Sequence, residues 1–184
     1  MSTTWQVALG VEPDERLLAL LRELEEKPVS RLTRHAAPCC AIAEAWFRAT
    51  ARAAVRRFGD EPRWISKRWE WGPTAWPIAW CEAIKEEALD CGALADLAAV
   101  AFEEAGREVV RVQLIDEASP EECEQWAVKW AAVPTAPRWI WHGLVYHETV
   151  SVRRSEGLRV WDPVSGRWEN GKRAKAMLFF PARG

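Results

Sequence analysis

The amino-acid sequence predicts a single α+β domain, in which a helical first half (residues 1–106) packs on an antiparallel sheet formed by residues 107–184. Helical periodicity dominates the first half, and one helix near the middle of the chain is almost free of charge. The last third consists of short β-prone segments separated by turn residues. Because helices and strands are segregated along the chain instead of alternating, the sheet is expected to be antiparallel.

Two amphipathic helices are predicted in the first half. Leucines recur at three- and four-residue steps after Asp14, a suitable N-cap, so residues 14–26 are expected to be helical. A longer helix is expected to begin near Pro38, which suits the first helical position, and to end at Gly59. The segment 59–77 is rich in Trp, Pro and Arg and has no clear period, which indicates an irregular but packed connection.

The middle of the chain predicts a buried helix followed by a strand. Nearly every residue from Cys91 to Phe102 is apolar, which is typical of a helix enclosed by its own domain, and Gly106 is expected to close it. Residues 108–115 alternate and are rich in β-branched side chains, as in a strand. Ser119 begins a capping box that should start a helix reaching about residue 132. The later expected strands are 144–152, 158–161 and 176–180.

Composition excludes several classes of function. The chain has 184 residues, 25 Lys and Arg and 27 Asp and Glu, so its net charge of −2 gives no overall field toward nucleic acid or an anionic membrane. Its five cysteines are odd in number and irregularly spaced, which indicates neither a disulfide framework nor a zinc module. No segment is apolar over the length of a membrane span, and no signal peptide is evident. We therefore expect a reduced, cytoplasmic protein.

Cys91 is the strongest candidate for a nucleophile. It follows Asp90, precedes Gly92 and opens the apolar helix, where backbone N–H groups and the helix dipole favour a thiolate. Gly92 leaves room for a carbonyl to approach the sulfur, and a backbone N–H at the helix start can donate to a developing oxyanion. Taken alone, a cysteine at such a position more often packs as a small hydrophobic side chain.

His147 and Asp162 are the expected base and its orienting carboxylate. They lie on two successive predicted strands, joined by a turn within the sequence RRSEG. A turn centred on Arg154-Ser155 would place the two residues directly opposite each other. Pairing Val152 with Leu158 instead shifts the register by one residue, so the sequence leaves two registers open. In either case His147 is expected to accept the thiol proton while Asp162 holds its tautomer.

These segments resemble the transglutaminase-like branch of the papain-like cysteine enzymes. DCGALADLAAVAFEEAGREVVRVQL is similar to the family's nucleophile segment, in which a cysteine opens a helix that feeds a strand. HETVSV and RVWDP are similar to its histidine and aspartate strands. The resemblance covers roughly residues 80 to 165 and implies that Cys91, His147 and Asp162 act as nucleophile, base and orienter. It leaves the side-chain oxyanion donor open among the indoles of Trp71, Trp76 and Trp80.

Other residues compete for these roles. Cys39-Cys40 also stands at a helix start four residues after His35, but Pro38 separates this histidine from the helix and no suitable carboxylate follows. A metal-binding regulator that uses the same residues is a third class of function, ranked lowest. His142 is an alternative base, although Gly143 interrupts its strand. The remaining cysteines, Cys81 and Cys123, are expected to be packing residues without partners.

The 13 tryptophans allow two interpretations. Those between Trp64 and Trp80, with Trp139 and Trp141, either line a substrate site or fill a core built around many alanines, and the core is the more common outcome. A local basic stretch is expected to be a solvated face; it consists of Arg52, Arg56, Arg57, Arg63, Lys67 and Arg68.

The expected function is cysteine-dependent acyl transfer or hydrolysis. The substrate would be an amide, peptide or acyl thioester, the intermediate an acyl-enzyme on Cys91, and neither a metal nor an organic cofactor is needed for this chemistry. No nucleic-acid or membrane partner is expected, and the sequence leaves the oligomeric state open. The alternative is a non-catalytic peptide-binding module on the same fold, which would use a Trp-rich surface.

Overall fold

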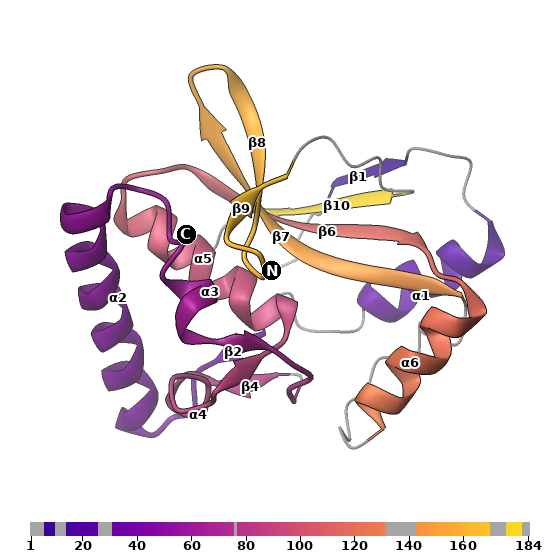
Figure 1. Cartoon of the computed structure of the whole chain (residues 1–184), viewed down its shortest axis with the longest axis horizontal. Coiled ribbons are helices and arrows are strands. Elements are labelled where there is room, and N and C mark those ends of the chain that lie inside the picture. Colours follow the sequence, from indigo (N-terminus) through magenta and orange to yellow (C-terminus); the bar gives the residue numbers. More distant parts are fainter. Residues whose placement is uncertain are drawn as a thin grey trace.

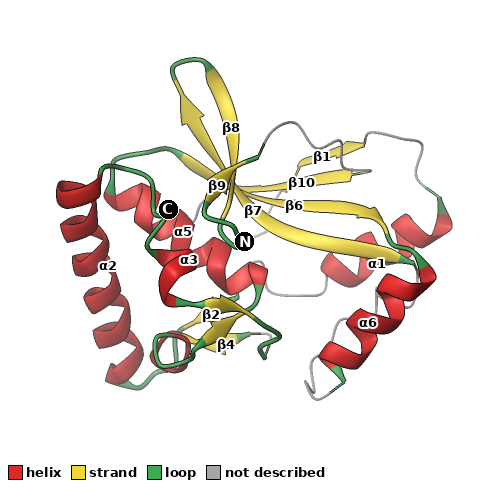
Figure 2. Cartoon of the chain, in the orientation of Figure 1, coloured by secondary structure: helices red, strands yellow, loops and turns green. Residues whose placement is uncertain are grey.

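The computed structural model describes residues 6–9, 14–25, 31–75, 77–131, 143–169 and 176–181, which form a mixed α+β fold. Figures 1 and 2 show a sheet that crosses the molecule. In this view one group of helices lies below its left part and another below its right part. The helices are α1 (Glu15–Glu25), α2 (Pro38–Phe58), α3 (Ile65–Arg68), α4 (Trp80–Ala83), α5 (Cys91–Glu104) and α6 (Pro120–Trp130). None of the helices in these ranges is long and apolar enough to cross a membrane.

The main sheet has six strands, all paired antiparallel as predicted, in the order β1-β10-β6-β7-β8-β9. Two further sheets are parallel pairs, β2 with β4 and β3 with β5. The strands are β1 (Gln6–Leu9), β2 (Leu32–Thr33), β3 (Glu70–Trp71), β4 (Ile78–Ala79), β5 (Ala88–Leu89), β6 (Val109–Glu117), β7 (Leu144–Arg154), β8 (Gly157–Asp162), β9 (Arg167–Trp168) and β10 (Ala176–Pro181).

The helix boundaries follow their local signals. Asp14 Oδ1 accepts the backbone N–H of Leu17 at 2.9 Å, and α2 ends at Gly59, whose φ of 86° favours glycine. The Ser119 hydroxyl accepts the N–H of Glu122, whose carboxylate accepts the N–H of Ser119 in return, which is the predicted capping box. The four longer predicted helices therefore lie within one or two residues of their expected ends.

The first half also contributes strands, which differs from the expected division of the chain. β1 pairs with β10 at one edge of the main sheet, and four short strands form the parallel pairs. The signal for these elements is weak because two- to four-residue strands are defined by their partners and not by their own periodicity.

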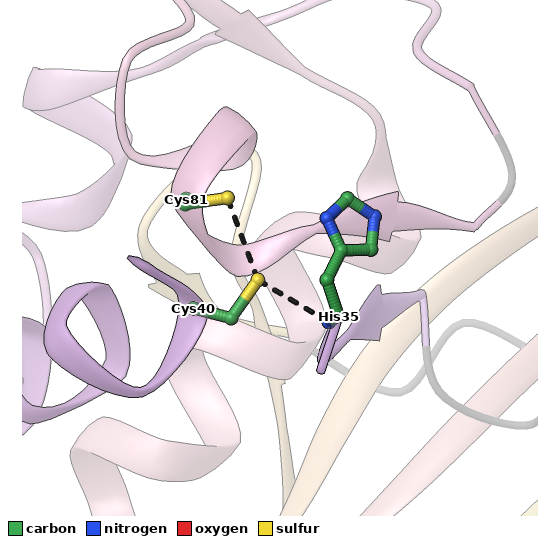
Figure 3. A group of neighbouring side chains, drawn as sticks. All are labelled: His35, Cys40 and Cys81. Carbon is green, nitrogen blue, oxygen red and sulfur yellow. Dashed lines mark hydrogen bonds between the residues drawn. The ribbon is translucent and has the colours of Figure 1, made fainter. Parts of the chain in front are cut away.

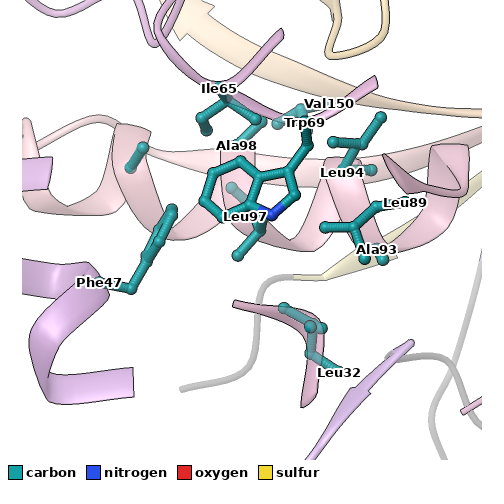
Figure 4. Close-up of a cluster of buried hydrophobic side chains, with 14 of the residues drawn as sticks. Leu32, Phe47, Ile65, Trp69, Leu89, Ala93, Leu94, Leu97, Ala98 and Val150 are labelled. Atoms are coloured by element: carbon teal, nitrogen blue, oxygen red, sulfur yellow. The ribbon is translucent and has the colours of Figure 1, made fainter. Parts of the chain in front are cut away.

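The core lies around α5, which packs between α2 and the sheet strands β6 and β7. Leu94, Leu97 and Ala98 have no exposed surface, and Trp69 covers them (Figure 4). The irregular segment is packed, as predicted, because Trp69 and Trp80 are almost fully buried and stack around Phe47. The tryptophans described in this segment thus serve mainly as core residues.

The β7–β8 hairpin has a register that differs from both predicted alternatives. Arg154 pairs with Gly157 and Val150 with Trp161, so the turn is Ser155-Glu156, one residue beyond the turn expected from the sequence. Gly157 has a φ of 119°, a conformation that glycine tolerates and other residues rarely adopt. A two-residue loop is a tight connection between antiparallel strands. Its position decides which residues of β7 and β8 lie opposite each other.

Candidate active site

The side chain of Cys91 is held at the start of α5. The Asp90 carboxylate accepts the backbone N–H of Ala93 at 2.8 Å and caps the helix, and the short strand β5 leads the chain into this cap. Cys91 is buried, with 8% of its surface exposed. Its sulfur therefore lies where the uncompensated N–H groups of a 14-residue helix favour negative charge.

His147 and Asp162 meet on one face of the sheet. The observed register, continued by one pair, sets Asp162 opposite Thr149, so that His147 is its diagonal neighbour two residues away. Diagonal residues share a face, and here His147 Nε2 lies 3.0 Å from Asp162 Oδ1. The predicted contact is therefore present, although the direct pairing from which it was argued is not.

Asp162 is fixed by the turn that follows it. Its side chain accepts the backbone N–H groups of Val164 at 2.9 Å and Ser165 at 3.3 Å. Burial tends to raise the pKa of Asp162, but the hydrogen bond and positive charge of His147 and these turn contacts hold the pKa below its ordinary value of 3.8. The carboxylate is therefore ionised and oriented toward His147.

His147 is electrostatically coupled to both Asp162 and Cys91. Burial tends to lower the pKa of His147, but the hydrogen bond to Asp162 and the interactions with the Cys91 and Asp162 side chains raise it to about 10. Because Nε2 is taken by Asp162, Nδ1 is the ring nitrogen available to the sulfur. The arrangement stabilises the imidazolium form of His147.

A buried ionic network that sequence reasoning missed lies behind Cys91. Arg31 is 2% exposed and pairs with Asp90, and its backbone N–H donates to Asp96 at 2.7 Å. Asp96 also binds Arg111 at 2.8 Å, and Arg111 pairs in turn with Glu148, the residue after the candidate base. The network thus joins the helix that carries the cysteine to the strand that carries the histidine.

Asp96 was the one signal of this network, as the single charge within the apolar helix. Its carboxylate accepts the backbone N–H groups of Arg31 and Leu32 and pairs with the side chain of Arg111. Both carboxylate oxygens therefore have partners although the side chain is buried. Burial lowers the pKa of Arg31, and electrostatic interactions with Tyr146 and Cys91 offset this only in part.

Gly92 has a different role from the predicted one. A Cβ atom at this position would lie 2.7 Å from Arg31 Nε and 2.8 Å from Arg31 Cδ. The space beside the glycine backbone is therefore filled by Arg31, and it is not left open for a substrate carbonyl. The glycine is needed because a buried arginine crosses the first turn of α5.

The indoles considered as oxyanion donors differ in burial and in their neighbours. Trp80 is 5% exposed and packs against Phe47 in the core. Trp71 is half-buried, pairs with Leu89 two residues before Cys91, and makes an edge contact with Trp126 of α6. Trp71 therefore belongs to the strand pair that leads into the start of α5. The other candidates lie outside the described residues, namely Trp76, Trp139, Trp141 and the alternative base His142.

The basic stretch lies on the surface, as predicted. Arg52 binds Glu104 at 2.6 Å, Arg63 binds Glu61 at 2.7 Å, and Arg68 stacks over Trp69. The exposed members of this stretch thus have neighbours within the chain, in keeping with a solvated face.

The predictions for the remaining cysteines need correction. Cys81 was expected to pack without a partner, but its sulfur lies 3.2 Å from Cys39 Sγ and 3.4 Å from Cys40 Sγ. The backbone N–H of His35 also donates to Cys40 Sγ at 3.4 Å. Pro38 does not separate the histidine from the helix, because the chain folds back across the first turn of α2.

Comparison of the chain with models of protein families, with curated proteins and with solved structures gives no match.

Proposed function

We propose that this chain is a cysteine-dependent acyltransferase or hydrolase of the transglutaminase-like kind, with Cys91 as nucleophile, His147 as general acid and base, and Asp162 as orienter. The observation that carries the proposal is the 3.0 Å contact of His147 Nε2 with Asp162 Oδ1, in a histidine whose pKa is also raised by its interaction with Cys91. A cysteine that opens a buried helix, followed by histidine and aspartate on adjacent antiparallel strands, also supports the finer assignment of the fold.

The first half of the reaction follows from the charges. The Cys91 thiolate attacks the carbonyl carbon of an amide, peptide or thioester, and the carbonyl electrons move onto oxygen. The backbone N–H of Cys91, at the helix start, stabilises this oxyanion, with the Trp71 indole as the side-chain donor. As the intermediate collapses, the leaving amine or thiolate takes the proton of the His147 imidazolium and departs as a neutral amine or thiol, and an acyl thioester remains on Cys91.

The second half regenerates the site. Neutral His147 takes a proton from water or from an amine acceptor, which attacks the acyl thioester. Collapse of the second intermediate releases a carboxylic acid or a new amide and restores the thiolate and imidazolium. Asp162 stays ionised throughout and fixes the ring so that one nitrogen faces Cys91.

Alkylation of the intact chain tests the activated cysteine. Iodoacetamide labelling of each cysteine is followed against pH by peptide mass spectrometry, and Cys91 is expected to react well below the pH of about 8.5 typical of a free thiol. Cys123 is the internal control, because it is a half-buried free cysteine on α6, apart from the other four cysteines. Equal and slow labelling of all five cysteines would contradict the proposal.

Turnover is tested by intact-mass spectrometry after incubation with a library of amides, peptides and acyl thioesters. An acyl adduct on Cys91 is expected, and Cys91→Ala should form none while keeping the far-UV circular dichroism spectrum of the wild type. Adding a primary amine distinguishes transfer from hydrolysis by the product that accumulates. Unchanged turnover in Cys91→Ala would refute the assignment.

A further inference from the structure

Three side chains with metal-binding atoms converge far from one another in the sequence. The imidazole of His35 and the sulfurs of Cys40 and Cys81 have ligand atoms that all lie within 4.8 Å of one another (Figure 3). Cys40 lies in the first turn of α2 and Cys81 in α4, 41 positions further along the chain. A fourth donor is close, because Cys39 Sγ lies 3.2 Å from Cys81 Sγ.

The parallel pair β2–β4 explains the convergence. Thr33 pairs with Ala79 at the ends of these strands, and in a parallel pair both chains leave the sheet at the same edge. His35 and Cys81 each follow their strand by two residues, so they emerge side by side. The first turn of α2 is tied to this edge by the hydrogen bond from the His35 N–H to Cys40 Sγ.

The donor set matches the preference of zinc. Zn²⁺ in structural sites takes four nitrogen and sulfur ligands in a tetrahedron, including sets of three cysteines and one histidine. Zinc–sulfur bonds of about 2.3 Å in a tetrahedron separate two sulfurs by about 3.8 Å. The sulfur separations of 3.2 and 3.4 Å here need only a small rotation of side chains to reach that value. His35 and Cys39 are exposed, so an ion can enter from solvent.

We propose that His35, Cys40 and Cys81, with Cys39 as fourth donor, bind one zinc ion. The site is distinct from the candidate active site, because within the described part of the chain its hydrogen bonds run among its own residues and not to Cys91, His147 or Asp162. Bound zinc would fasten the start of α2 to α4 and to the edge of β2–β4, and so would stabilise the helical layer against which α5 packs.

Cobalt substitution tests the site on the full-length, reduced chain. Co²⁺ added to the wild type is expected to bind with one ion per chain, to give the intense visible bands of tetrahedral coordination and near-ultraviolet sulfur-to-metal charge transfer, and to be displaced by Zn²⁺. Cys40→Ser and Cys81→Ser should each weaken binding at least about 10-fold. Cys123→Ser is the matched control and should bind as the wild type does.

Three results would overturn the proposal. These are a wild-type chain without the cobalt bands, serine variants that bind cobalt with unchanged spectrum and affinity, and a chain prepared without air that already holds a disulfide from Cys81 to Cys39 or Cys40. The wild-type spectrum reports sulfur ligation by itself, so the test holds even if a serine variant fails to fold. Because activity is not measured, the outcome is independent of the proposed acyl-transfer function.

Discussion

Replacing Asp162 with asparagine removes the charge beside His147 and keeps the size of the side chain. The amide oxygen can still accept a hydrogen bond from Nε2, so the variant isolates the electrostatic contribution of the carboxylate. The imidazolium loses its stabilising partner, and the thiolate of Cys91 in turn loses part of the positive charge that supports it. We expect the pH range over which Cys91 is paired with an imidazolium to narrow from its upper end.

The geometry sets the size of this effect. Two unit charges about 4 Å apart interact by about 1 kcal/mol in water and by about 4 kcal/mol at a partly shielded protein site. The His147 side chain is 36% exposed and that of Asp162 is 11% exposed, so an intermediate value of about 2 kcal/mol applies. At 1.36 kcal/mol for each pKa unit, the pKa of His147 should fall by about 1.5 units, and the upper transition in the alkylation of Cys91, which reports loss of the imidazolium, should move down by the same amount.

The assay is the pH dependence of iodoacetamide labelling at Cys91 in wild type and Asp162→Asn. Asp60→Asn is the matched control, because Asp60 pairs with Arg107 and lies near Arg154, at the opposite end of β7 from the site. The control should label as the wild type does. If Asp162→Asn also leaves the upper transition unchanged, the carboxylate does not support the imidazolium and the electrostatic argument is wrong.

Two further predictions follow from the same site. The pKa of His147 in the folded chain, about 10, exceeds its ordinary value of 6.5, so its stabilising contribution is complete below about pH 6.5 and is lost as pH rises through about 10. Urea unfolding of the wild type should therefore show a loss of stability between about pH 6.5 and 10 that His147→Asn lacks, and parallel curves would contradict it. Gly92→Ala should lower the free energy of unfolding by about 1–3 kcal/mol, because the new methyl group meets buried Arg31 and this outweighs the gain of about 1 kcal/mol in helix propensity. A more stable Gly92→Ala chain in the same urea titration would show that Arg31 moves aside freely.

Local chemistry accounts for the elements that were predicted well. The capping side chain of Asp14, the capping box at Ser119 and the glycine that ends α2 all act within four residues of the boundary they define. Such signals are readable without knowing the rest of the fold. The strand β1 has no comparable signal, since its pairing with β10 involves residues at the other end of the chain.

The candidate site was predictable in composition but not in geometry. Cys91 is recognisable because a helix start is a local feature, and the proximity of His147 to Asp162 follows from any hairpin that joins their strands. The register was not predictable, because the position of a two-residue turn depends on which residues the sheet buries. The diagonal contact depends on that turn and was therefore visible only in the folded chain.

The sequence by itself determined the helices, the β-rich last third, and the three residues to which acyl chemistry is assigned. Tertiary structure alone decided that Arg31 lies behind the nucleophile and that Cys81 joins two cysteines 41 and 42 residues away. The physical reason is the difference in range between interactions along the chain and interactions in space. Caps and periodicity act between neighbours in the chain, whereas ion pairs and metal-type clusters depend on distances in space, which are set only when distant elements pack.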